Sequence, residues 1–371
     1  MKKILILGTG SAQKDIIEYC SNRDYYVITT SNVKGYSAEK LADEFRQIDI
    51  TNIQETEKLA REKNVDFIYS VGSDVAMPTI AKASDDLNLP CFISYNIALV
   101  CNHKYMLRKL LEDKNVDGNI PYQIIENIDE DINISFPAVM KPSDSQGQRG
   151  VYKVDNIEEL KEHFSDSLSF SREKKVIVEQ YIDGDEISVN VFLENGDIRF
   201  YLISDRIVWS EYPGGLIKEH VIPSKYEKYD EIVYRIRKLV EETIQALGIE
   251  NGPVYYQIKI DKKGKPHIIE ITPRLDGCHM WRAIKYCTGV DLLEASINLL
   301  EGKSYDQPSD YTVEPHSLEF LCGVPGSEFN KSNYTIPDNE FLKWYYEDGQ
   351  TINRMNGYFE KCGYVIKKGS K

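Results

Sequence analysis

Short apolar runs alternate with amphipathic stretches over the first hundred residues. Residues 3–7 are an apolar run that a glycine turn closes, and a helical pattern follows it. The alternation continues, so we expect further strands at 26–30, 67–71 and 91–93, and helices at 13–22, 56–63 and 78–87. Strands separated by helices are typical of a parallel sheet with right-handed crossovers. Residues 1–100 are therefore predicted to form an α/β domain.

The turn after the first strand carries part of a dinucleotide-binding fingerprint. Gly8 and Gly10 match its first two glycines, but Gln13 stands where the third belongs. Two glycines alone are better explained by a tight strand-to-helix turn at the edge of a site.

From Asn102 onward the pattern mixes longer helices with short strands and turns, which indicates an α+β region. Helices are expected at 103–112, 231–247 and 291–300, and a hairpin is expected at 254–260 and 267–271. Further strands are expected at 138–141, 150–154, 176–180 and 186–193, and the tail from about 304 is rich in strand and turn residues. Asn195-Gly196 marks a hairpin turn.

Charge and cysteine content narrow the function classes. The 371 residues carry 45 Lys and Arg against 59 Asp and Glu, a formal charge of −14. This charge disfavours nucleic acid and membrane as broad-surface partners, although a small basic pocket stays compatible with it. No apolar run approaches the ~20 residues that span a bilayer. Seven cysteines without a Cys-x-x-Cys pair argue against a zinc site or a disulfide framework and favour a cytoplasmic setting.

The most informative segment is residues 137–151. Lys141 ends an apolar strand, and the following loop, 143–150, is rich in Ser, Gln and Gly. Free backbone amides in such a loop form a nest for anions, and the lysine adds a positive charge. The spacing differs from a Walker A loop, in which the lysine follows the glycines. A solvated hairpin loop with an exposed lysine would show the same pattern.

Carboxylates and an arginine extend this pattern along the chain. Glu179 ends an apolar strand, and Glu186 follows seven positions later. On the predicted hairpin, Gln257 and Glu270 can point to the same face and offer oxygen ligands to Mg²⁺. Arg274 lies beyond the strand end, where it could bind a phosphate. A surface hairpin with scattered charges is the alternative.

This order of lysine, Gly-rich loop, paired glutamates, Gln, Glu and Arg resembles the ATP-grasp superfamily. It is most similar to the carboxylate–amine ligase branch, which includes the carbamoyl-phosphate synthetase large subunit and the L-amino acid ligases. The resemblance implies a Rossmann-like pre-ATP-grasp domain at 1–100 and an ATP-grasp domain at 101–305 with its lid at about 115–182. A small β-rich C-terminal part would follow at 306–371.

The resemblance also implies residue roles. Lys104 and Lys141 would bind the ATP phosphates, and Arg274 would lie near the transferred phosphoryl group. Glu179 would accept a hydrogen bond from the adenine amino group, and Glu186 would accept one from a ribose hydroxyl. The remaining nucleotide contacts would come from the phosphate loop and the adenine linker, namely Ser143, Ser145, Gly147, Gly150, Tyr181 and Ile182.

The metal positions implied by the resemblance are Gln257, Glu270 and Thr272. Thr272 departs from the family, which usually has Asn as a further Mg²⁺ ligand there. Gln257 stands where many members have an acidic residue. One carboxylate, Glu270, is thus left to hold Mg²⁺ or Mn²⁺ together with ATP oxygens.

Residues for a second substrate are less defined. Arg206 could bind a substrate carboxylate, or it could form an ion pair on an exposed strand. His279, close after Arg274, is a weaker candidate for substrate contact. His220 is expected to be structural, and Cys278 to be a small buried residue rather than a nucleophile.

The resemblance implies an ADP-forming ligase that activates a carboxylate as an acyl phosphate and couples it to an amine. A phosphotransferase on the same fold and a non-catalytic ATP-binding module are the alternatives, and Thr272 is the feature that favours the last. The expected partners are small carboxylates and amines, with no nucleic acid and no membrane, and a homodimer would be compatible with the resemblance.

Overall fold

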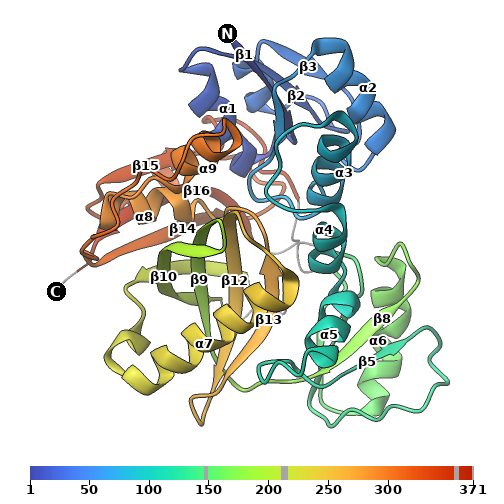
Figure 1. Ribbon diagram of the computed structural model, residues 1–371. Coiled ribbons are helices and arrows are strands. Elements are labelled where there is room, and N and C mark those ends of the chain that lie inside the picture. The colour runs from blue at the N-terminus through green and yellow to red at the C-terminus, as the bar shows by residue number, and fades with distance from the viewer. Residues whose placement is uncertain (146–148, 210–215, 355–358, 370–371) are drawn as a thin grey trace.

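The computed structural model describes residues 1–145, 149–209, 216–354 and 359–369, whose strands form three sheets. Figure 1 shows the N-terminal domain at the top, a small lobe at the lower right, and a large sheet that extends to the left. Helices α3 (Met77–Leu87), α4 (Tyr95–Asn102) and α5 (Lys104–Asp113) follow one another from the N-terminal domain down to the small lobe.

The N-terminal domain is a parallel sheet, as the alternating pattern predicts. Its four strands are ordered β3-β2-β1-β4 and packed by helices. The elements are β1 (Lys2–Leu7), α1 (Ser11–Ser21), β2 (Tyr25–Thr30), a short 3₁₀ helix (Ser37–Leu41), β3 (Glu44–Arg46), α2 (Ile53–Lys63) and β4 (Phe67–Tyr69).

The predicted strand at 91–93 is wrong, because these residues form a bend before α4. Their apolar side chains are nonetheless partly or fully buried. Phe92 makes an edge-on contact with Tyr69 at 5.8 Å between ring centroids, and its ring lies where a Cβ at Gly252 would be placed. Packing between the N-terminal domain and the large sheet thus accounts for the apolar run.

The small lobe is a four-stranded antiparallel sheet in the order β5-β8-β6-β7. Helix α6 (Ile157–Ser169) covers it and closes a separate apolar core around Leu160 and Phe164. The strands are β5 (Tyr122–Ile125), β6 (Ala138–Pro142), β7 (Tyr152–Val154) and β8 (Val176–Gln180).

The large sheet has the order β13-β12-β9-β10-β11-β14-β16-β15, so the C-terminal strands extend the same sheet that carries the predicted hairpin. Asn195 and Gly196, both at positive φ, form the predicted turn between β9 and β10. The strands are β9 (Gly184–Glu194), β10 (Asp197–Val208), β11 (Ile217–Ile222), β12 (Gly252–Asp261), β13 (Pro266–Thr272), β14 (His316–Gly323), β15 (Phe341–Trp344) and β16 (Glu360–Lys368).

Three further helices pack on the large sheet. The apolar face of α7 (Asp230–Leu247) joins the core formed by β12 and β13, and the helix ends at Gly248 as expected. Helices α8 (Met280–Thr288) and α9 (Leu292–Leu300) share a core with strands β1 and β2 of the N-terminal domain. Two 3₁₀ turns (Lys225–Lys228 and Lys331–Asn333) complete the elements of the described residues. None of their helices has the length and apolar character needed to cross a membrane.

Candidate active site

A buried carboxylate joins the small lobe to α5. The Glu179 side chain, on β8, accepts a hydrogen bond from Nε of Arg108 at 2.8 Å and one from Nζ of Lys141 at 2.6 Å. Each contact uses a different carboxylate oxygen, and all three side chains are buried. Lys141 is thereby fixed at the end of β6 with two N–H groups left to donate.

Charge compensation sets the protonation of this cluster. Burial alone would raise the pKa of Glu179, but the charges of Arg108 and Lys141 outweigh it and lower the pKa to about 2. Burial and the nearby Arg108 and Lys104 lower the pKa of Lys141, while Glu179 opposes that shift. The carboxylate is therefore ionised at neutral pH and holds the lysine in place.

Lys104 begins α5 and contacts the loop after β6. Its backbone N–H donates to the carbonyl of Ser143 at 3.1 Å, and its Nζ donates to the carbonyl of Ser145 at 2.6 Å. The hydroxyl of Ser143 is fully buried and faces Ser171. Lys104 thus holds the start of the proposed phosphate loop beside Lys141, whereas Gly147 lies outside the described residues.

Gly150, at the other end of this loop, has a packing reason to be glycine. Its φ is +69°, and an added Cβ would lie 2.9 Å from the Phe170 ring and 3.1 Å from a backbone atom of Ser167. This close approach explains the residue without a ligand.

The linker predicted to contact adenine is already engaged in part. The Tyr181 N–H donates to the carbonyl of Pro137 at 3.0 Å, and the Ile182 carbonyl accepts from Nζ of Lys259 at 3.2 Å. The Tyr181 ring lies between two ammonium groups, with Nζ of Lys153 at 4.6 Å and Nζ of Lys259 at 5.0 Å from its centroid. The linker is therefore held by residues of the small lobe and by Lys259 of β12.

The predicted hairpin brings the two metal candidates together. Gln257 on β12 is the direct partner of Glu270 on β13, and Thr272 lies two residues further along the same face. The side-chain amide of Gln257 donates to Glu186 at 2.9 Å, which leaves its carbonyl oxygen as an acceptor. Glu186 also accepts a hydrogen bond from Arg206.

Glu270 lies near all three of the cations that are proposed to bind phosphate. Burial and the nearby carboxylate of Asp74 raise its pKa, while Lys104, Arg274 and Lys141 lower it. Within the described residues its carboxylate has no hydrogen-bond or ion-pair partner. The oxygen donors of Gln257 and Glu270 fit a hard cation such as Mg²⁺. The buried hydroxyl of Thr272 also lacks a partner there and faces the same way.

Arg274 is held by a carboxylate from the N-terminal domain. Its Nε and Nη2 donate to the two oxygens of Asp74 at 2.6 and 2.5 Å, a bidentate pair across 200 residues of sequence. Arg274 is 6% exposed. The pairing fixes the guanidinium plane next to Glu270.

The two candidates for a second substrate are both engaged with protein. His279 is 1% exposed, and its ring nitrogens lie 2.6 Å from Asp15 and 2.6 Å from the Tyr345 hydroxyl. Neither nitrogen is thus left for a substrate. Arg206 is buried in its ion pair with Glu186 rather than exposed, but its Nε has no partner among the described residues.

Two residues of the cluster, Arg108 and Asp74, were missed in the sequence. Arg108 lies one helical turn after Lys104 on α5, a spacing that places both on one face. Asp74 follows β4 at the carboxyl end of a parallel sheet, where ligand-binding residues collect. Both signals were present, but neither reveals its partner.

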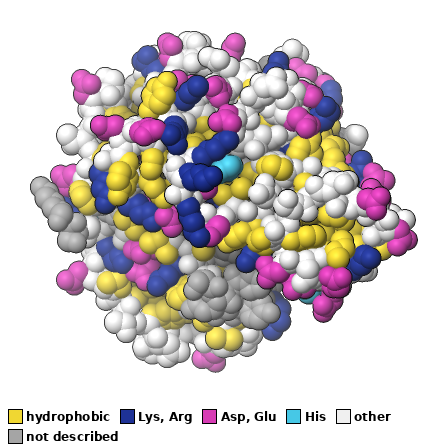
Figure 2. Space-filling view, turned by 90° about the horizontal axis from the view of Figure 1, so that it is seen from below, with side chains coloured by type: hydrophobic (Ala, Val, Ile, Leu, Met, Phe, Trp, Pro, Cys, Tyr) yellow, Lys and Arg dark blue, Asp and Glu magenta, His cyan; other side chains and the backbone are white. Residues whose placement is uncertain are grey.

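The excess of acidic residues is not spread evenly over the surface. Figure 2 shows Lys and Arg side chains gathered near the middle of one face, with acidic side chains mainly around the rim. A net charge of −14 therefore coexists with local positive charge that suits an anionic ligand.

Comparison with known proteins gives a family model and several relatives that match this chain. Residues 134–281 match the family model described as the ATP-grasp domain. The chain is 27% identical over 302 residues to a phosphoribosylamine–glycine ligase of Methanosphaera stadtmanae, covering 73% of this chain and 67% of that protein. It is 21% identical over 333 residues to a carbamoyl phosphate synthase large chain of Thermoanaerobacter pseudethanolicus, covering 82% of this chain and 29% of that protein.

Among solved structures, the L-amino acid ligase from Bacillus licheniformis superposes with a TM-score of 0.82 at 20% sequence identity. The superposition covers 99% of this chain and 93% of that chain. The likeness in fold therefore extends well beyond the matched segment and includes the N-terminal sheet and the C-terminal strands.

Proposed function

We propose that this chain, which carries an ATP-grasp domain, is an ADP-forming ligase that activates a carboxylate as an acyl phosphate and couples it to an amine. One feature supports this most directly: Lys104, Lys141 and Arg274, from three separate parts of the chain, lie near enough to the Glu270 carboxylate for their charges to lower its pKa. Cations beside oxygen donors suit the transfer of a phosphoryl group, which needs charge neutralisation rather than a covalent nucleophile.

In the proposed reaction, a substrate carboxylate oxygen attacks the γ-phosphorus of ATP and ADP leaves. The amine nitrogen then attacks the acyl carbon, and inorganic phosphate departs with the former carboxylate oxygen. Lys104 and Lys141 would neutralise the phosphates, and Arg274 would orient the transferred group through its fixed plane. Mg²⁺ or Mn²⁺, held by Gln257 and Glu270 with Thr272 beside them, would supply further charge neutralisation.

The contacts of Glu179 favour a role in positioning Lys141 over the adenine contact that the resemblance implies. Both of its oxygens already accept hydrogen bonds, from Arg108 and Lys141. We therefore propose that Glu179 positions Lys141 for the phosphates, rather than accepting from the adenine amino group. Glu186, between Arg206 and Gln257, would still offer an oxygen to the ribose.

We propose three parts: a Rossmann-like pre-ATP-grasp domain at 1–100, an ATP-grasp domain at 101–305 with a lid at about 115–182, and a C-terminal part at 306–371. The separate core of the small lobe supports the lid. Strands β14 to β16 extend the large sheet, which means that the C-terminal part would complete the ligase rather than fold apart from it. We likewise propose a cytoplasmic protein with small-molecule substrates.

Product analysis tests the reaction class. The chain is incubated with Mg-ATP and a panel of amino acids and small carboxylates, singly and in pairs, and ADP and free phosphate are both measured. A ligase releases phosphate in equal amount to ADP when carboxylate and amine are both present. ADP with the phosphate retained on a product would indicate a phosphotransferase instead, and ATP binding without ADP formation would indicate a non-catalytic module.

A further inference from the structure

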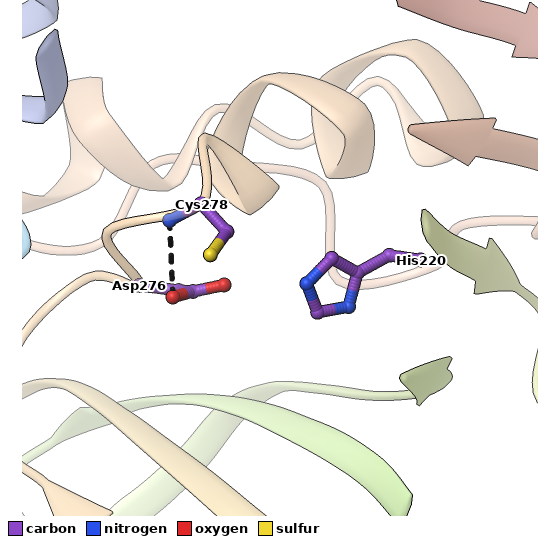
Figure 3. A group of neighbouring side chains, drawn as sticks. All are labelled: His220, Asp276 and Cys278. Carbon is purple, nitrogen blue, oxygen red and sulfur yellow. Dashed lines mark hydrogen bonds between the residues drawn. The ribbon is translucent and has the colours of Figure 1, made fainter. Parts of the chain in front are cut away.

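A second group of potential ligands lies in the described part of the chain, and it shares no residue with the proposed nucleotide site. His220 is on β11, and Asp276 and Cys278 are on the loop between β13 and α8. One donor atom from each lies within 4.8 Å of the other two, and all three residues are buried. Figure 3 shows the Asp276 carboxylate and the Cys278 sulfur on one side and the His220 ring facing them from the other.

Three buried polar atoms of this group lack hydrogen-bond partners among the described residues. His220 is 0% exposed, and neither ring nitrogen has a hydrogen-bond partner among the described residues. The Oδ2 atom of Asp276 is likewise without a partner, although Oδ1 accepts from the Cys278 N–H at 3.1 Å. Buried polar atoms without a partner are rare, because each costs free energy that a bound group can recover.

We propose that His220, Asp276 and Cys278 bind a divalent transition-metal ion, with Zn²⁺ as the best match. An imidazole nitrogen, a thiolate sulfur and one carboxylate oxygen are ligand types that Zn²⁺ accepts and that Mg²⁺ would not select as a set. Donors around tetrahedral Zn²⁺ lie about 3.3–3.8 Å apart, given bond lengths of about 2.0–2.3 Å. Closing the present group needs shifts of about 1 Å, which side-chain rotation can supply.

Charge balance also permits the ion. Binding replaces the thiol proton of Cys278 by the metal and releases that proton to solvent. The thiolate and the Asp276 carboxylate then neutralise the two charges of the ion. Three cations lie nearby. Arg206 is already paired with Glu186 and Arg274 with Asp74, and Nζ of Lys361 lies 3.5 Å from the cysteine sulfur, where it stabilises a thiolate.

The lack of a Cys-x-x-Cys pair makes a zinc site built from cysteine pairs improbable, but it does not bear on a site with a single cysteine ligand. Here a strand and a distant loop each supply donors, a combination that only the fold brings together. Asp276 is oriented by its bond to the Cys278 N–H, as ligating carboxylates commonly are by a neighbouring donor. The inference does not depend on the proposed ligase activity.

Titration with Co²⁺ as a spectroscopic substitute for Zn²⁺ tests the site. The full chain is stripped with a chelator, and Co²⁺ is added in the presence of excess Mg²⁺, which is included to saturate the proposed site at Gln257 and Glu270. We expect one equivalent to produce a thiolate-to-Co²⁺ charge-transfer band and tetrahedral ligand-field bands. Added Zn²⁺ should then abolish both. The absence of a charge-transfer band in the folded wild-type chain would overturn the proposal.

Variants identify the ligands. Cys278→Ser should abolish the charge-transfer band, and His220→Gln should weaken Co²⁺ affinity at least tenfold. Cys287→Ser is the matched control, because Cys287 is also buried but lies outside the group, and it should leave the spectrum unchanged. A band that survives Cys278→Ser, or that Cys287→Ser removes, would refute this ligand set. Stability to urea establishes that each variant is folded, and the wild-type titration stays decisive if one is not.

If Co²⁺ does not bind while a substrate carboxylate protects the Cys278 thiol from alkylation, these residues line a substrate pocket and the metal proposal fails.

Discussion

Replacing Arg108 with methionine tests whether the buried cluster around Glu179 stabilises the fold. The guanidinium donates to Glu179 at 2.8 Å and to the carbonyl of Ile269 at 3.3 Å, and the side chain is 1% exposed. Removing one partner of a buried ion pair costs about 3–5 kcal/mol, because the other charge stays buried. Lys141 still compensates Glu179 in this variant, so we expect a loss at the lower end, about 3 kcal/mol.

The pKa of Glu179 gives a second route to this magnitude. A pKa lowered from 4.5 in the unfolded chain to about 2 in the fold corresponds to about 3 kcal/mol of stabilisation at neutral pH. Because the folded pKa is the lower one, this stabilisation is fully present above pH 4.5 and is lost as the pH falls toward 2. The lowered pKa of Lys141 opposes it in part. Without Arg108 the pKa of Glu179 rises toward its unfolded value, so the stability that is lost between pH 4.5 and pH 2 should be smaller than in the wild type.

Urea unfolding at neutral and mildly acidic pH measures the effect. Lys109→Met is the matched control, because Lys109 lies on the same helix but is 63% exposed in its ion pair with Asp113. Such an exposed pair contributes about 0.3–0.5 kcal/mol. If Arg108→Met loses no more than about 1 kcal/mol relative to this control, the cluster does not stabilise the fold as argued. A loss of stability on acidification below pH 4.5 as large as that of the wild type would count equally against it.

Four further outcomes are expected. Lys141→Ala and Glu270→Ala should each lose at least about a hundredfold in ATP-dependent turnover while remaining folded, since single contacts of this kind contribute about 3–4 kcal/mol, and near-wild-type rates would contradict the site. Thr272→Asn should keep or raise turnover, because it adds an amide oxygen beside Glu270, and a large loss would reveal another role for the hydroxyl. Hydrogen exchange over residues 143–150, part of which lies outside the described residues, should slow with a non-hydrolysable ATP analogue, and no change at saturation would remove the loop from the site. Gly72→Ala should lower stability and turnover together, because its Cβ would lie 2.5 Å from a backbone atom of the loop after β13, and a rate unchanged from wild type would refute that contact.

Local patterns were sufficient for much of the fold. The alternation of strands and helices predicted the parallel sheet, and the spacing around the glycine turn predicted the hairpin that pairs Gln257 with Glu270. The order of motifs also indicated the ATP-grasp superfamily, and residues 134–281, which contain these motifs apart from Lys104, match the family model of the ATP-grasp domain. Each strand, helix, turn and motif used here is recognised from a few neighbouring residues, and their order along the chain supplies the rest.

Features that depend on distant partners could not be predicted in the same way. The strand expected at 91–93 is a bend, because burial of Phe92 against Tyr69 satisfies the apolar run without strand pairing. Helix α8 was missed because His279, at φ +59° and without a side-chain cap, gives no helix-start signal. Helix α6 could have been found, since Asn156 caps the N–H of Glu159 in a recognisable pattern.

The N-terminal turn illustrates how the structure decides between two interpretations. Gln13, which replaces the third fingerprint glycine, is buried, and its side chain bonds the N–H of Gly10 and the carbonyl of Val71. The side chain thus fills the turn that a dinucleotide would need open. This geometry favours the tight-turn interpretation over dinucleotide binding.

The N-terminal domain instead holds the loop that carries Arg274, Asp276 and Cys278, and it does so at both ends. Asp74 forms the bidentate pair at the start of the loop, and Asp15 binds His279 at its end. Between them the backbones meet directly, since the Gly72 N–H donates to the carbonyl of Leu275 at 3.2 Å and a Cβ at Gly72 would lie 2.5 Å from the Cα of Gly277. A loop held at three points by another domain has little freedom to move its arginine. Preorganisation of Arg274, rather than a ligand of its own, is therefore the contribution we assign to the first hundred residues.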